Sequence, residues 1–401
     1  MFFKTKELIT TKYIIYGIST IFGRGLEYLV ILFVSAYLSK EVYGEFEFYK
    51  RTIEFLMIIV SFGTPTLILS YTKSSKSKAN FLLISIIVSV VILLLLIPIL
   101  SYFGYVFLWR AVLFYSLFFY SNSIVQVFNL VENGSNRNAL YKIIGSLIFN
   151  SLIVFFVIYS NDKSKAIIYA STFALVIYLP YLLMVLHKYY VNKYFVHFRK
   201  YFKLFLNLLY GSFTLVLNSF INIAFLTTDI FIIKLFTDDK ILSNTLIANY
   251  SFPLTLSGAL IIISLTISQV EVEKVKRNHS IIYQVISKIN TLTLISSILL
   301  FISYYLLVNY QYTHFKETIG VFSLILIAKI FQALSVPYGM IVLIKKKFNL
   351  NLKINLFILL FNLLFSIVAY EYLSLYGIAL ISLISLILRY FYYRLKLKTI
   401  L

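Results

Sequence analysis

Long apolar runs, repeated from one end of the chain to the other, are the feature that most constrains its fold. Each run has about 20 residues, enough for a helix to cross the roughly 30 Å hydrocarbon core of a bilayer. Within lipid, a helix satisfies its own backbone hydrogen bonds, whereas an irregular segment does not. The runs span residues 13–38, 52–71, 80–102, 106–129, 140–159, 166–187, 205–236, 241–268, 281–308, 318–344, 354–370 and 376–393. We therefore predict an all-α integral membrane protein with about 12 transmembrane helices.

Composition and charge agree with this class and exclude a soluble one. Hydrophobic residues make up 61% of the 401 residues and charged residues only 13%, which is far from the averages of soluble domains. The formal net charge of +21 could suggest a nucleic-acid partner, but the lysines and arginines follow the expected topology. An even number of spans places both termini on one side of the membrane. Most cations then lie in loops on that side, which we predict to be cytoplasmic. The lipid bilayer, and no nucleic acid, is the expected partner.

The longest basic segment divides the chain into two halves. We predict an N-terminal six-helix bundle at residues 1–187, a basic cytoplasmic linker at 188–204 and a C-terminal six-helix bundle at 205–401, with the two halves around a central cavity. Six spans in each half give both halves the same orientation, as in transporters built from parallel repeats. The similar stretches YGISTIF (16–22) and YGSFTLV (210–216) are weak evidence for duplication, and chance explains them equally well.

Residues suited to covalent or metal chemistry are scarce. The chain has no cysteine and only 4 histidines, which lie in or beside the expected loops. Disulfides, thiol chemistry and a structural metal are therefore not expected. The expected loops are short and contain no acid–base set of the kind that an enzyme acting on sugars needs. We expect a protein that is not an enzyme and that uses no cofactor.

Several motifs at helix ends resemble those of one transporter family. After Arg24, the run AYLSKEVYG at residues 36–44 resembles the end of helix 1 in Wzx-like polysaccharide-biosynthesis flippases. These flippases belong to the MOP (multidrug/oligosaccharidyl-lipid/polysaccharide) exporter superfamily. The stretch SFGTPTLILSYTK at residues 61–73 is similar to the end of their helix 2, and TDIFII at 228–233, followed by Tyr250, looks like their helix 7. In the number and order of helices, the resemblance extends over nearly the whole chain.

The resemblance implies a cargo and a location. It predicts a flippase that moves an undecaprenyl-pyrophosphate-linked oligosaccharide across the bacterial cytoplasmic (inner) membrane, for the synthesis of O antigen, capsule, lipopolysaccharide or a related glycan. A polysaccharide polymerase and a chain-length regulator are the implied protein partners. Two alternatives stay open: a multidrug or other lipid exporter of the same superfamily, and a membrane-embedded polysaccharide polymerase or ligase.

Two cations near the middle of predicted spans are the predicted ligands of the cargo's phosphates. Arg24 and Lys329 each lie about 11 residues into a span, which places them roughly 16 Å deep. Charged residues at this depth usually mark a substrate pathway, and both side chains suit phosphate. The alternatives are that Arg24 pairs with Glu27, one turn away, and that Lys329 reaches the membrane interface or a partner on another helix.

Polar residues at helical spacing predict a surface for the sugar. One stripe contains Thr214, Asn218, Asn222 and Asp229, and another contains Asn122, Gln126, Asn129 and Asn133. The predicted substrate-binding residues are Asn218, Asn222, Asn122 and Gln126, although polar packing between helices explains such stripes equally well. Because intramembrane carboxylates commonly bind a proton or a sodium ion, Glu27 and Asp229 are the predicted residues for ion coupling. Asp229 lies near the outer boundary of its span, where the preferred alternative is a solvated side chain.

Overall fold

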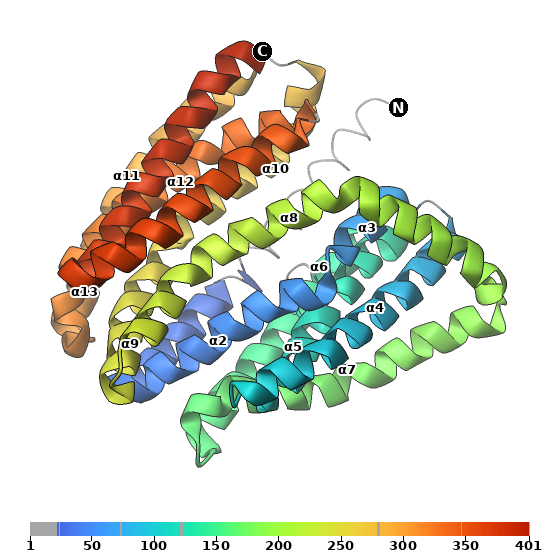
Figure 1. Ribbon diagram of the computed structural model, residues 1–401, viewed down its shortest axis with the longest axis horizontal. Helices are drawn as coiled ribbons and strands as arrows, with labels where there is room; N and C mark the ends of the chain where they lie inside the picture. Colours follow the sequence, from blue (N-terminus) through green and yellow to red (C-terminus); the bar gives the residue numbers. More distant parts are fainter. Residues whose placement is uncertain are drawn as a thin grey trace. The chain divides into compact units, whose positions relative to one another are not determined.

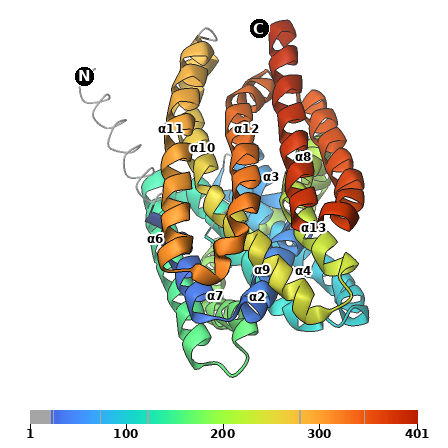
Figure 2. The same ribbon diagram turned by 90° about the vertical axis from the view of Figure 1, so that its left-hand side faces the viewer.

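The protein is helical throughout the part that the structure describes. The computed structural model describes residues 22–23, 25–72, 74–120, 123–278, 281–345 and 347–400. These residues form α-helices, short 3-10 helices and the turns between them, and no strand occurs among them (Figure 1). Long helices lie side by side in bundles, as a second view also shows (Figure 2). The prediction of an all-α protein is confirmed.

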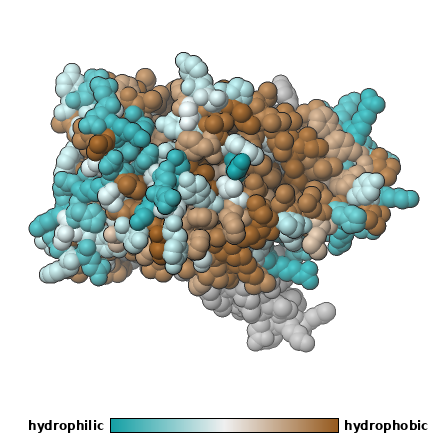
Figure 3. All heavy atoms as spheres, turned by 90° about the horizontal axis from the view of Figure 1, so that it is seen from below, coloured by the Kyte–Doolittle hydropathy of each residue, from teal (hydrophilic) through white to brown (hydrophobic). Residues whose placement is uncertain are grey.

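Many of these helices have the length and composition of membrane spans. Seven helices within the described ranges are long and apolar enough to cross a membrane, or up to nine if each bent helix pair forms one span. Their outward-facing residues include large apolar side chains such as Leu95, which is 70% exposed, and Ile298, which is 62% exposed. Apolar atoms cover much of one face of the molecule (Figure 3). Helices with such surfaces are typical of membrane spans, which supports a multi-pass membrane protein, and the count of about 12 spans stays a prediction.

Several helices differ from the predicted runs because turns interrupt or extend them. The run 106–129 is divided among η1 (Val106–Leu108), α5 (Trp109–Phe118) and the start of α6 (Ile124–Tyr159). The last two runs both lie in α13 (Phe348–Ile400), in which Ser374 has non-helical backbone angles. The two arms of α13 contact each other, because Asn362 donates a hydrogen bond to Ser382 at 3.0 Å. Helix α13 therefore folds back on itself at Ser374.

The described chain forms two compact units, which share helix α2 (Lys40–Ser61). Unit 1 comprises Met1–Leu38 and Phe48–Phe220, and unit 2 comprises Ser39–Glu47 and Ile221–Leu401. The first two turns of α2 thus belong to unit 2 and the rest of that helix to unit 1. The basic segment 188–204 lies within unit 1. Because these units reflect packing alone, the two predicted six-helix bundles and their linker stay a prediction.

Unit 1 is a bundle whose helices are interrupted at glycines. Besides part of α2, α5 and α6, it contains α3 (Thr64–Tyr71), α4 (Ser75–Tyr102), η2 (Lys163–Lys165), α7 (Ala166–Val191), η3 (Tyr194–His197) and the first part of α8 (Phe198–Phe236). Gly63, with φ of 67°, precedes α3, and α2 and α3 meet at 52°. Gly134, with φ of 80°, interrupts α6. Glycine tolerates such positive φ values without steric cost.

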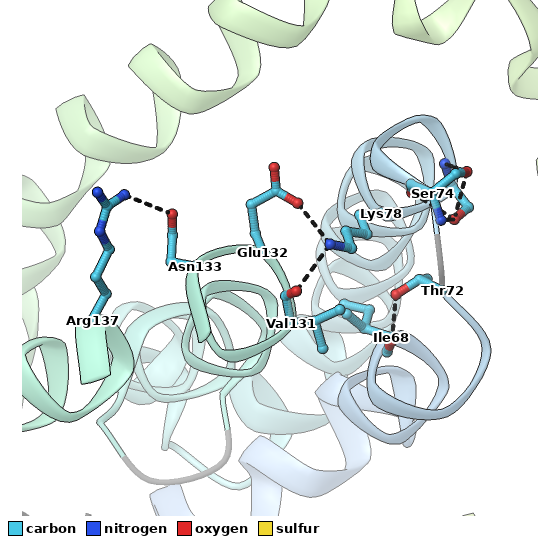
Figure 4. A network of polar contacts seen from close by, with 9 residues as sticks. Ile68, Thr72, Ser74, Lys78, Val131, Glu132, Asn133 and Arg137 are labelled. Carbon is cyan, nitrogen blue, oxygen red and sulfur yellow. Dashed lines mark hydrogen bonds and ion pairs between the residues drawn. The ribbon is translucent and has the colours of Figure 1, made fainter. Parts of the chain in front are cut away.

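A polar network in unit 1 holds the start of α4 against the interruption of α6 (Figure 4). The ammonium of Lys78 donates to the carbonyl oxygen of Val131 at 2.9 Å and lies 3.1 Å from the carboxylate of Glu132. Ser74 and Ser77 form a capping box at the N-terminus of α4. Lys78 is one of the basic residues that follow the second predicted span, on the predicted cytoplasmic side, and its side chain is largely buried in this network.

Unit 2 contains the remaining helices around an apolar core. These are the last part of α8, α9 (Lys240–Ser257), α10 (Ala259–Arg277), α11 (Ile281–Tyr310), η4 (Thr313–Thr318), α12 (Ile319–Ile344) and α13. Asp239 caps α9 by accepting hydrogen bonds from the backbone amides of Ile241 and Leu242. The core includes Val285, Ile341, Ile358 and Tyr393 from α11, α12 and both arms of α13. Packing of these helices brings together polar residues that are distant in sequence.

Candidate functional site

A cavity within unit 2 contains two of the predicted site residues. Four helices supply its walls: α8, α9, α12 and the second arm of α13. Its polar lining consists of Asp229, Tyr250, Lys329 and Ser382, and its apolar lining includes Phe225 and Leu386. The structure thus brings together Lys329, predicted to bind phosphate, and Asp229, predicted to couple ions. The roles themselves stay predictions.

The Asp229 carboxylate is buried and only partly hydrogen-bonded. Asp229 is 4% exposed, and its Oδ2 atom accepts hydrogen bonds from the Tyr250 hydroxyl and from Ser382 Oγ, the latter at 2.9 Å. Its Oδ1 atom is buried and has no hydrogen-bond partner among the described residues. A buried carboxylate needs partners of opposite charge or hydrogen-bond donors. One carboxylate oxygen therefore remains available in the cavity.

Lys329 supplies the positive charge in the same cavity. The residue is 4% exposed, its ammonium donates to Gln332 Oε1 at 3.0 Å, and it interacts electrostatically with Asp229. A Lys329 side chain that reached the membrane interface would not be buried in this way. The other alternative, a partner on another helix, agrees with the interaction between Lys329 and Asp229. Taking a charge out of water is costly unless an opposite charge is near. Asp229 and Lys329 therefore compensate each other in part.

The polar stripe on α8 continues away from this cavity. The Asn218 side chain is buried and donates to the carbonyl oxygen of Thr214 at 3.0 Å, one turn earlier in the same helix. Asn222 Oδ1 accepts a hydrogen bond at 3.4 Å from Arg389 Nη2 on α13. Sequence reasoning did not single out Arg389, because this arginine lies near the end of its predicted run. Its place inside the apolar run 376–393 was the sequence feature that could have indicated a buried arginine.

Glu27 in unit 1 has partners that differ from the expected one. Its carboxylate accepts a hydrogen bond from the Tyr120 hydroxyl at 3.3 Å and lies 3.7 Å from the ammonium of Lys50. Lys50 is only 6% exposed, and it was missed because the predicted span began at residue 52, whereas α2 begins at Lys40. Arg24 lies outside the described residues, so its predicted pairing with Glu27 stays untested.

The second polar stripe lies in unit 1 at the start of α6. Gln126 is 4% exposed, and its backbone amide donates to the N-cap Ser123 Oγ at 3.4 Å. Asn129 accepts a hydrogen bond from the Tyr181 hydroxyl at 2.9 Å. Asn122 lies outside the described residues. Gln126 and Asn129 thus lie inside unit 1. Both predicted interpretations of the stripe, a sugar-binding surface and polar packing between helices, agree with this position.

Within the described ranges, no group of three or more His, Asp or Glu residues is placed to hold a metal ion.

The sequence itself identifies the family. Residues 9–272 match the family of polysaccharide biosynthesis proteins. The chain belongs to this family. No curated protein sequence matches the chain significantly.

Solved structures show the same fold at low sequence identity. The lipid II flippase MurJ, in an inward closed conformation, has a TM-score of 0.60 and 17% identity over 96% of this chain and 87% of MurJ. A mutant of the Vibrio cholerae MATE transporter VcmN has a TM-score of 0.58 and 11% identity over 99% of this chain and 98% of the transporter. A MOP superfamily transporter from Pyrococcus furiosus has a TM-score of 0.52 and 12% identity over 98% of this chain and 96% of its own.

Family and fold agree with the motifs at the helix ends. The resemblance to polysaccharide-biosynthesis flippases of the MOP superfamily is confirmed. The chain shares its fold with flippases and transporters, and its apolar helices are those of a multi-pass membrane protein. The buried Asp229 and Lys329 therefore lie in a fold that transporters use, and intramembrane charges commonly mark a functional site.

Proposed function

We propose that the chain is a flippase that moves undecaprenyl-pyrophosphate-linked oligosaccharide units across the bacterial cytoplasmic membrane by alternating access. The observation that carries this proposal is a buried ammonium, Lys329, in a cavity of a membrane protein that belongs to a polysaccharide biosynthesis family. A polysaccharide polymerase, which would extend the exported units, and a chain-length regulator are the proposed downstream partners. The bacterial inner membrane is the proposed location.

Lys329 acts as a ligand for the pyrophosphate. In the empty state its ammonium interacts with Asp229 and Gln332. A phosphate that enters the cavity competes with the carboxylate for this ammonium, because both are oxygen anions and ammonium binds either as a point charge. The Asp229 carboxylate keeps its hydrogen bonds from Tyr250 and Ser382 when Lys329 turns to the phosphate. Arg24 is the second proposed phosphate ligand.

The other predicted residues take supporting roles in this proposal. Sugar hydroxyls would bind to the amides of Asn122, Gln126, Asn218 and Asn222. Glu27 and Asp229 are the proposed coupling residues. Protonation of Asp229, or binding of a cation to its unpartnered Oδ1, would remove its attraction for Lys329. This neutralisation would favour cargo binding, because the ammonium would no longer be attracted to this carboxylate.

The proposal is tested by replacing Lys329 in a strain that lacks the native gene. We expect Lys329→Ala to abolish surface glycan and to accumulate the lipid-linked oligosaccharide, and Lys329→Arg to retain part of the export. Lys288→Ala removes an exposed lysine from α11 and should export normally. Protein levels are matched by immunoblot. Normal surface glycan in the deletion strain, or from Lys329→Ala, would contradict the proposed function.

Multidrug export is a second candidate, because one observation favours it. The unpartnered Oδ1 of Asp229 would suit a cationic drug, and MATE transporters share the fold. The neighbouring Lys329 weighs against a cationic cargo, since like charges in a cavity repel. If drug export is the function, deletion of the gene should increase sensitivity to cationic drugs and leave surface glycan unchanged.

A further inference from the structure

A second polar contact between α8 and α13 repeats the first one two turns away. Ser382 donates to Asp229 at 2.9 Å, and Arg389 donates to Asn222 at 3.4 Å. On each helix the two contacts are seven residues apart, in opposite chain directions, so these segments run antiparallel. Seven residues correspond to two helical turns, or about 10 Å. Arg389 therefore lies about two turns along α13 from Ser382, and one turn beyond Leu386 at the edge of the cavity that holds Lys329.

The guanidinium of Arg389 is oriented but not neutralised. Its Nη2 atom donates to Asn222, and the group lies over the ring of Tyr393 at 5.8 Å from the ring centroid. Among the described residues, its Nε atom is buried without a hydrogen-bond partner, and no carboxylate pairs with the guanidinium. An arginine presents several N–H donors in one plane, which match the oxygens of a phosphate. This arginine thus has two contacts that orient it and at least one donor, Nε, without a partner among the described residues.

The predicted topology places Arg389 on the cytoplasmic side of the cavity. The reversal at Ser374 connects the last two predicted spans, and this connection is external if both termini are cytoplasmic. Arg389 lies 15 residues beyond it, or roughly 22 Å along a helix in a core of about 30 Å. A headgroup that enters from the inner leaflet would therefore meet Arg389 before it meets Lys329.

We propose that Arg389, oriented by Asn222 and Tyr393, is a phosphate-binding site that receives the pyrophosphate headgroup of the lipid-linked substrate before Lys329 does. This inference rests on the proposed flippase function and adds the entry position of the headgroup. Arg389 contacts the phosphate, whereas Asn222 and Tyr393 are positioning residues. The same chemistry would recognise the phosphate of an anionic phospholipid, so the test separates these two sources.

Binding is measured with the purified full chain in nanodiscs of neutral phosphatidylcholine, titrated with undecaprenyl pyrophosphate. We expect Arg389→Gln to raise the Kd at least about tenfold, as loss of a charge-assisted hydrogen bond does. Arg389→Lys should lie between the two, because charge remains without the planar donors. Arg394→Gln is the matched control: this exposed arginine lies on the same arm of α13, and its replacement should change the Kd by less than about twofold.

Two further measurements separate positioning and folding from binding. Asn222→Ala should raise the Kd and also make binding less sensitive to replacement of Arg389, since both changes act on one group. Thermal unfolding identifies variants that fail to fold. If Arg389→Gln fails to fold, Arg389→Lys carries the test: an unchanged Kd for a folded Arg389→Lys would overturn the proposal, and an intermediate Kd would support it.

Three results would overturn the site. The first is an unchanged Kd for folded Arg389→Gln while Lys329→Ala weakens binding, which would leave the flippase function intact. The second is an effect of Arg389→Gln only on binding to nanodiscs that contain phosphatidylglycerol, which would make Arg389 a contact for bilayer lipid. The third is no binding of undecaprenyl pyrophosphate by the native chain together with normal surface glycan in the deletion strain, which would remove the flippase function as well.

Discussion

At the scale of single residues, three charges inside the two units have partners from other helices. Lys329 interacts with Asp229, Lys50 with Glu27, and Arg389 with Asn222. Each pair joins residues that are at least 23 positions apart, as Lys50 and Glu27 are. Burying a charge near its partner costs less than burying it alone. These contacts therefore fix helices relative to each other within a unit as well as placing charges for transport.

Replacement of Lys50 tests whether its contact with Glu27 stabilises the packing of helices in unit 1. We expect Lys50→Met to destabilise the protein by about 1–3 kcal/mol, because the Glu27 carboxylate loses a nearby ammonium while remaining largely buried. The double variant Lys50→Met, Glu27→Gln should recover much of this loss, since both charges are then absent. Thermal unfolding in detergent, followed by size-exclusion chromatography, measures both. Equal melting temperatures for the single and double variants would contradict the pairing.

Sequence reasoning found some of these residues and missed others for a physical reason. Lys329 stands in the middle of a long apolar run, so its burial could be predicted from hydropathy. Asp229 lies near the outer end of its run, where a solvated side chain is the usual interpretation, and this interpretation is wrong because the residue is buried. Lys50 lies in the polar start of α2, where no apolar run marks the helix, and Arg389 lies near the end of a run, where an interfacial position is the usual interpretation. Their partners depend on packing between helices, which local sequence does not determine.

At the scale of secondary-structure elements, two of the motif residues at helix ends act through packing. Gly44 on α2 lies against α9: a Cβ atom at this position would be 1.8 Å from the carbonyl oxygen of Asn244. Beside it, the buried Tyr43 ring packs edge-on against Phe252 and Phe315. The Tyr-Gly pair thus permits the start of α2 to approach α9 within unit 2. The motif at residues 36–44 contains the predicted end of a helix, Gly25–Tyr37, and also the start of α2.

A side chain at Gly44 should therefore separate α2 from α9. We expect Gly44→Ala to destabilise the protein by about 3 kcal/mol or more, since the nearest atoms belong to backbone and cannot turn away. Gly339→Ala is the matched control on α12, because a Cβ atom there has no neighbour within 4 Å. Alanine favours a helix over glycine by up to about 1 kcal/mol, so this control should be neutral or stabilising. Similar melting temperatures for the two variants would exclude the close approach.

The reversal of α13 makes a second prediction for an element. Ser374 has a φ of 51°, a conformation that residues other than glycine adopt at a cost of about 1–3 kcal/mol. We expect Ser374→Gly to raise the melting temperature and Ser374→Ala to leave it unchanged or lower, because only glycine relieves the steric conflict. Both variants are compared by thermal unfolding of the purified protein. A lower melting temperature for Ser374→Gly than for Ser374→Ala would show that the serine is not strained.

At the scale of the whole molecule, hydropathy predicted the class and motifs predicted the family. Apolar runs identify helices for lipid because a bilayer leaves few other structures possible, and this part of the prediction is confirmed. The assignment of chain segments to compact units was less accessible: residues 39–47 belong to unit 2, although the chain enters unit 1 on both sides of them. Such a division follows from tertiary packing, for which a hydropathy profile has no signal.

The orientation of the chain in the membrane is the remaining prediction for the whole molecule. The chain has no cysteine, so single cysteines report the side of the membrane without background. Ser75 and Asn192 are exposed and lie in loops predicted to be cytoplasmic, and the exposed Asp238 lies in a predicted external loop. An impermeant thiol reagent added to intact cells should therefore label Asp238→Cys and not Ser75→Cys or Asn192→Cys.

Permeabilised cells provide the control for this labelling, because all three cysteines should then react. The result determines more than the map of loops. The order of the two proposed phosphate contacts, Arg389 first and Lys329 second, assumes that the C-terminal end of α13 is cytoplasmic. Labelling of Ser75→Cys and Asn192→Cys in intact cells, with Asp238→Cys protected, would reverse this order. Arg389 would then lie on the exit side, where it would release the headgroup into the outer leaflet.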